Sequence, residues 1–334
     1  MRVFFSYIIS FVILIFSFIL ITSCDKQDDV VSADTERLTL KFSYDQTENL
    51  FSNQRITKQQ ISNKEEQLSG SEQVRVVVRA YPIVNRKRAE KHTFEKSFTR
   101  TADGYDFETI IDLPLGEYEI LAWSDFLVNG YPLHNAEDFS EVTFSSDHIG
   151  CSFCREAFRG SAAISIFGGD QNNHNNTYEI VMKKPLARFE LLTDDLAEFL
   201  TAEVARRKGE EVNIDDYVVA FYYVGFMPIA YSLFKDAPVD STTGMMFTST
   251  LKPKSETEAS LGFDYVFVNN KDSAVTIRIG VYDNDGYLVS LTQPIKVPLK
   301  RNNVTALRGS FITQVSSDGI LIDRDFKGDY NLFL

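Results

Sequence analysis

The chain has 334 residues, a formal net charge of −13 at pH 7 and 3 cysteines. An acidic chain without a basic run is repelled by nucleic acid and by anionic lipid headgroups, so nucleic acid is excluded as a partner class. The length is sufficient for two domains, and with so few cysteines their stability must come from hydrophobic cores rather than from disulfides.

The first 24 residues have the pattern of an export signal. Arg2 gives a basic start, an apolar run follows to Ile21, and small polar residues lead to Cys24. Such a segment is removed rather than folded, so we expect residues 1–23 to be a signal peptide. The end of this segment resembles the lipobox of bacterial lipoproteins, in which the cysteine thiol is acylated. One alternative is an ordinary signal peptide. The other is an uncleaved anchor, because the apolar run is long enough to span a bilayer.

An acidic stretch follows Cys24, from Asp25 to Asp29. Because such a stretch cannot bury itself, we interpret residues 24–36 as a solvated tether between lipid and domain. The predicted location is the outer membrane, with the protein attached by its lipid and exposed at the cell surface.

The remaining sequence predicts mostly strands. Leu38, Leu40, Phe42 and Tyr44 alternate with polar residues, which is the period of a half-buried strand with these four side chains inward. A polar stretch, residues 45–73, follows this strand. Further β-rich runs, interpreted as strands, span residues 74–80 (ended by Pro82), 94–98, 105–111, 118–123, 160–168, 177–183 and 186–192. We expect residues 94–123 to form successive antiparallel strands, with a tight turn at 112–116.

One helix is predicted in the second half, over residues 193–209. Asp195 and Glu198 fit a capping box, and Gly209 is suited to end the helix. Strands resume at 218–224, 245–250, 261–268, 275–282, 287–292, 307–315 and 319–323, with a hairpin turn at 283–286. Many short strands and one helix predict an all-β protein of two antiparallel β-sandwiches, at residues 37–190 and 191–334.

Several segments resemble fimbrillin-like (FimA/Mfa-like) surface lipoproteins of Bacteroides-type bacteria. The most specific is residues 112–125, DLPLGEYEILAWSD, and the others are REAFRG at 155–160, MKKPLARFE at 182–190, and the segments 297–313 and 319–331. The resemblance implies two transthyretin-like domains and a fimbrial or fimbria-like subunit (shaft, anchor or tip) with no cofactor. Its partners would be the outer membrane, other fimbrial subunits, and a host protein or glycan.

The resemblance also implies a mechanism of assembly. In polymerising members, a protease cuts after a basic residue and removes the first strand, and a strand from the next subunit fills the opened groove. Here the removable strand would be 38–44, the cleavage site Arg55, and the donor the segment 319–334. The alternative is that 38–44 is a permanent core strand and 45–73 an ordinary long loop.

Other chemistry is weakly supported by the sequence. Cys151 and Cys154 form a CxxC pair, for which we expect a local disulfide or two free thiols rather than a metal or redox site. No catalytic motif is present, so we predict no enzymatic activity and no metal site. Trp123 is expected in the core rather than as a sugar-stacking platform. A stand-alone lipoprotein that binds a glycan or host ligand is the second functional hypothesis.

Overall fold

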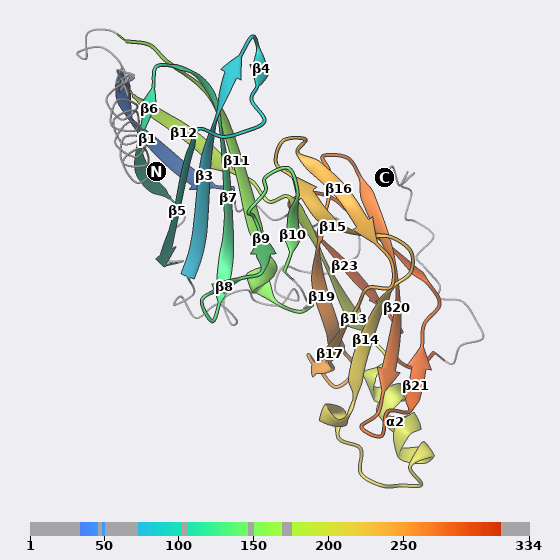
Figure 1. Ribbon diagram of the computed structural model, residues 1–334. Coiled ribbons are helices and arrows are strands. Elements are labelled where there is room, and N and C mark those ends of the chain that lie inside the picture. Colours follow the sequence, from blue (N-terminus) through green and yellow to red (C-terminus); the bar gives the residue numbers. More distant parts are fainter. Residues whose placement is uncertain are drawn as a thin grey trace, which may run out of the picture.

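The computed structural model describes residues 34–45, 49–50, 73–101, 106–145, 150–168 and 176–314 (Figure 1). Strands dominate these ranges, and the predicted all-β class is confirmed. Within them the α-helix is α2 (Leu196–Arg206). No helix in the described ranges is both long and apolar enough to cross a membrane.

The first half of the chain packs two sheets face to face. One sheet has the order β12-β1-β6, and the other has the order β11-β7-β3, with β5 and β4 also paired to β3 and β8 paired to β7. The strands are β1 (Thr35–Tyr44), β3 (Gln73–Val84), β4 (Lys87–Arg88), β5 (Phe94–Thr101), β6 (Phe107–Pro114), β7 (Gly116–Val128), β8 (Tyr131–Pro132), β11 (Ala157–Ile166) and β12 (Thr177–Met182). Their inward side chains form one hydrophobic core.

The strand pairing here differs from the sequence expectation. β5 pairs with β3, β6 pairs with β1, and β7 lies between β3 and β11, so β5, β6 and β7 are not successive antiparallel neighbours. The chain crosses between the two sheets instead, because β6 and β7 both present alternating apolar residues to the same core from opposite sides. Gly116, at φ 151°, provides the backbone conformation at the crossing. β3 also continues past Pro82, where the sequence predicted its end.

The second half is another pair of packed sheets. Their orders are β18-β19-β13-β23-β2 and β17-β14-β20-β21, with β22 also paired to β20. The strands are β2 (Asn49–Leu50), β13 (Leu186–Thr193), β14 (Val218–Tyr223), β17 (Met246–Thr250), β18 (Lys252–Pro253), β19 (Ala259–Phe267), β20 (Ser273–Tyr282), β21 (Leu288–Leu291), β22 (Ile295–Leu299) and β23 (Asn303–Gly309). The predicted hairpin turn at 283–286 joins β20 and β21.

The helix α2 is present, but its predicted capping box is wrong. The Asp195 side chain makes no cap hydrogen bond. Its carboxylate instead accepts hydrogen bonds from the backbone N–H groups of Ile312 and Thr313, at 3.2 and 2.9 Å. Gly209 ends the helix as expected: it has φ 90°, and its N–H donates to the carbonyl of Val204.

A smaller sheet joins the two halves. Its order is β16-β15-β10-β9, formed by β9 (His134–Asn135), β10 (Val142–Phe144), β15 (Met227–Ser232) and β16 (Ala237–Thr242). The sequence analysis did not predict β15 and β16, because Pro228 and Pro238 interrupt the alternation of apolar and polar residues in these strands. A third hydrophobic cluster, which includes the fully buried Trp123, Tyr231 and Phe267, fills the junction, so the core placement of Trp123 is confirmed.

The predicted domain boundary between residues 190 and 191 falls inside β13. This strand lies between β19 and β23, which are both strands of the second half. We therefore propose that the boundary lies before β13, at Lys184-Pro185, where the chain leaves β12.

Candidate functional site

The first strand, β1, is hydrogen-bonded along both of its edges. It runs antiparallel to β6 and parallel to β12, so that Leu40 lies opposite Thr109 on one side and Tyr178 on the other. Figure 1 shows β1 between these two strands. Because β1 is the middle strand of this sheet, its removal would leave a groove with an open backbone edge on each side.

The side chains of β1 fill part of the core. Leu38 and Leu40 are fully buried and Phe42 is 2% exposed. Phe42 stacks on Phe107 of β6, with ring centroids 4.6 Å apart. The Tyr44 hydroxyl donates to the Ser124 hydroxyl at 2.8 Å, and burial raises the pKa of Tyr44. The predicted inward set of side chains is therefore confirmed.

The burial of β1 contributes a large part of the stability of this half. Each fully buried Leu or Phe side chain stabilises a fold by about 1.5–3 kcal/mol, so three of them contribute about 5–9 kcal/mol. That sum is comparable to the whole free energy of unfolding of a typical domain. A chain that lost β1 would need another strand in the same groove to remain folded.

The segment after β1 reaches the second half of the molecule. Asp45 donates its N–H to the carbonyl of Met182 at 2.9 Å, at the end of β12. The chain then forms β2, which pairs in parallel with β23, so that Asn49 lies opposite Asn303. Everything that precedes Arg55 in the described residues therefore occupies two sheets, one in each half. Arg55 itself lies outside the described residues.

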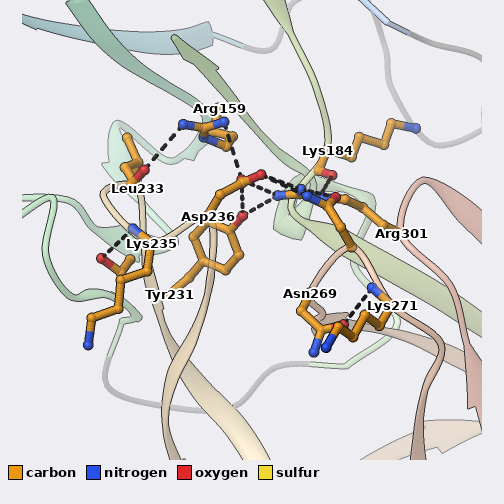
Figure 2. Close-up of polar contacts among 11 residues, drawn as sticks. Arg159, Lys184, Tyr231, Leu233, Lys235, Asp236, Asn269, Lys271 and Arg301 are labelled. Carbon is orange, nitrogen blue, oxygen red and sulfur yellow. Dashed lines mark hydrogen bonds and ion pairs between the residues drawn. The ribbon is translucent and has the colours of Figure 1, made fainter. Parts of the chain in front are cut away.

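A network of hydrogen bonds and ion pairs connects the two halves (Figure 2). Asp236, in the turn between β15 and β16, accepts hydrogen bonds from Arg301 at 2.7 and 2.9 Å and from the Tyr231 hydroxyl at 2.5 Å. Arg159 of β11, in the first half, lies 3.2 Å from the same carboxylate. Burial opposes ionisation of Asp236, but the hydrogen bonds and cations outweigh it and lower the pKa of this carboxyl.

Buried charges lie nearby in the same junction. Arg155 pairs with Asp264 at 2.5 Å, and the Tyr223 hydroxyl donates to the other oxygen of Asp264. Lys184 pairs with Glu156, also at 2.5 Å. Arg155 precedes β11 whereas Asp264 lies on β19, so the Arg155–Asp264 pair crosses between the halves. Sequence analysis missed this cluster because its members are distant along the chain.

A buried histidine belongs to the same region. His134 is fully buried, and its Nδ1 lies 3.4 Å from the carboxylate of Asp125. Two hydrogen bonds from Arg75 hold that carboxylate. Burial lowers the pKa of His134, and the attraction of Asp125 only partly offsets this effect. The imidazole is therefore neutral at pH 7, packed beside Trp123 and Phe144.

The predicted site residues are not brought together. Cys24 lies outside the described residues, as does Arg55. No disulfide joins Cys151 to Cys154 in the structure. Cys151 accepts a hydrogen bond from the N–H of Phe263 in the second half, whereas Cys154 packs against the core of the first half. The part of the chain that is described contains no cluster of three or more His, Cys, Asp or Glu side chains suited to a metal ion.

Comparison with known proteins gives one family match. The model of a family of unknown function, DUF6562, matches residues 30–333, which is nearly the whole chain. No curated protein matches this chain significantly.

Several solved structures are similar to the chain. A candidate adhesin from Bacteroides ovatus is 14% identical over 77% of this chain and 75% of its own, with a TM-score of 0.40. The fimbrial anchor protein Mfa2 from Porphyromonas gingivalis is 10% identical over 77% of this chain and 82% of its own, with a TM-score of 0.37. A fimbrial assembly protein from Parabacteroides distasonis is 10% identical over 83% and 92%, with a TM-score of 0.38. Proteins described as adhesins or as fimbrial are thus among its structural neighbours.

Proposed function

The chain belongs to the family DUF6562, and we propose that it is a lipid-anchored, fimbria-like subunit that acts at the cell surface in assembly and adhesion. The observation that supports this proposal best is the position of β1. It is a middle strand that contributes three buried side chains to the core, and yet it lies at the beginning of the described chain. The order of sequence motifs shared with fimbrillin-like lipoproteins supports the same proposal.

The proposed mechanism is strand addition after proteolysis. Cleavage after Arg55 would separate β1 and β2 from the rest of the chain, because both precede that residue. Loss of β1 opens the groove between β6 and β12, and loss of β2 opens the edge of β23. An extended segment of a second subunit would then restore the backbone hydrogen bonds, with alternate side chains in the positions of Leu38, Leu40 and Phe42.

The proposed anchor is an acylated Cys24. Residues 25–33, DKQDDVVSA, precede the described chain and carry three aspartates and one lysine among nine residues. A solvated tether of this kind allows the first half to lie away from the membrane surface. The lipid keeps the uncleaved subunit at the outer membrane until cleavage releases it.

An experiment in solution tests the proposal. The chain from residue 24 is made with a site for a sequence-specific protease in place of residues 52–58 and is then cut. We expect a ladder of oligomers after cleavage and none before it. A synthetic peptide of residues 34–45, added in excess, is the matched control and should suppress the ladder by refilling the groove.

Two outcomes would contradict the proposal. The first is a cut protein that remains monomeric under conditions in which the peptide of residues 34–45 exchanges into the groove. The second is an oligomer ladder that this peptide leaves unchanged, since the groove would then not be the site of assembly. An intact monomer that binds a glycan or host ligand would favour the stand-alone binding hypothesis.

A further inference from the structure

One face of the second half has an unusual composition for so acidic a chain. The strands β17, β14, β20 and β21 contain no Asp or Glu, although the chain has 47 of these residues. Their single charged side chain is Arg278, and β22, which also pairs with β20 in this sheet, adds the exposed Lys296. The face of this sheet that points away from the core is therefore apolar and aromatic, with a weak positive charge.

The outward side chains of β14, β17, β20 and β21 form a surface that we call the platform. Tyr222 and Tyr282 share a hydrogen bond between their hydroxyls at 2.7 Å. A Cβ atom at Gly280 would lie 3.0 Å from the ring of Tyr282 and 3.3 Å from that of Tyr222, so both rings lie down over this glycine. Exposed apolar side chains surround the rings: Val218, Met246 and Leu288 are 39%, 44% and 39% exposed.

The chain leaves the described structure beside this platform. After β23, Ile312 is buried in the core, and Asp195 binds the backbone N–H groups of Ile312 and Thr313. The carbonyl of Gln314 then accepts a hydrogen bond from the Ser290 hydroxyl of β21 at 2.9 Å. The described chain therefore ends at the edge strand of the platform sheet.

The remaining residues complement the platform in length, apolar character and charge. Residues 315–334 span up to about 66 Å at about 3.3 Å per residue, whereas four strands about 4.8 Å apart form a sheet less than about 20 Å wide. Residues 318–334 carry four aspartates against two basic residues, with apolar side chains at Ile320, Ile322, Phe326 and Phe333. An acidic, aromatic segment matches a sheet face that has Arg278 and no carboxylate.

We infer that residues 318–334 dock on this platform, within the same subunit, over the rings of Tyr222 and Tyr282. Burial of the exposed Val218, Met246 and Leu288 side chains drives the docking, and the charges orient the segment. This inference concerns the single, uncleaved subunit. If residues 319–334 also serve as the donor segment in strand addition, they must leave the platform before they can fill the β1 groove of another subunit.

Photo-cross-linking of the full chain tests this inference. The cross-linking residue p-benzoylphenylalanine is introduced at Met246 or, separately, at Leu288. The matched control carries it at Ile110 of β6, which is 52% exposed but lies in the first half. We expect cross-links from 246 and 288 to peptides of residues 318–334 at the mass of a monomer, and none from 110. A chain that ends at Ser317 should lose these cross-links.

Two results would overturn the inference. One is the absence of tail peptides among the cross-links from both platform positions while the protein remains folded by circular dichroism. The other is cross-linking only in species with the mass of a dimer, because the platform would then receive the tail of a second copy. An Arg278→Gln variant should lower the monomer cross-link yield, whereas a Lys271→Gln variant should leave it unchanged.

Discussion

Phe42 of β1 stacks on Phe107 of β6, with ring centroids 4.6 Å apart and planes at 4°. This contact joins the first strand to its antiparallel neighbour inside the core of the first half. It makes Phe42 the side chain whose loss best reports on how much β1 contributes to that core.

We predict that Phe42→Ala lowers the free energy of unfolding by about 3–5 kcal/mol, the range for large-to-small changes at buried aromatic positions. The measurement is urea denaturation followed by circular dichroism. Lys41→Ala is the control, because Lys41 is exposed on the same strand and should change stability little. Equal stability of the two variants would show that β1 is not integral to the core.

The network around Asp236 leads to a prediction about the junction. Asp236→Asn removes the negative charge that lies between Arg159 and Arg301 and should destabilise the protein by about 1.5–3 kcal/mol, the range for hydrogen bonds to charged groups. We expect faster amide hydrogen exchange in β10 and β15, which join the halves. Asp240→Asn, at an exposed position of β16, is the control. Unchanged exchange in β10 and β15 would mean that the apolar junction suffices without the network.

His134 predicts a dependence of stability on pH. Burial lowers its pKa in the folded state, so the unfolded chain binds a proton more readily. Protonation of His134 therefore leaves the free energy of unfolding unchanged above the unfolded pKa of about 6.5, and the free energy of unfolding falls as the pH drops below that value. We predict that His134→Leu has a smaller loss of stability between about pH 6.5 and 5 than the unchanged protein. Asn135→Ala, at the exposed neighbouring position of β9, removes no titratable group and should keep the original slope.

The sequence predicted most strands of this fold but few of their pairings. Alternation along Leu38, Leu40 and Phe42 was sufficient to place β1 and its inward face, since burial has a period of two residues in a strand. The pairing of β6 with β1 rather than with β5 depends on contacts between distant segments, which local patterns do not contain. For the same reason Asp195 fitted a helix cap in the sequence, whereas its carboxylate binds the backbone at Ile312 and Thr313.

The candidate site was predicted only in part. β1 was predicted because its residues alternate strongly between apolar and polar. Its middle position between β6 and β12 became clear only from the structure. Arg159 and Arg301 lie in segments that resemble the fimbrillin-like family, but no local pattern placed them beside Asp236, because these residues are distant along the chain until the fold brings them together.

The central claim is that β1 leaves the subunit. The most direct measurement is the intact mass and N-terminus of the protein taken from native outer membranes and from any surface polymer. We predict a lipidated form that begins at Cys24 in the membrane and a shorter form that begins at Ile56 in the polymer. A polymer whose subunits all retain residues 35–44 in a continuous, lipidated chain would contradict the claim.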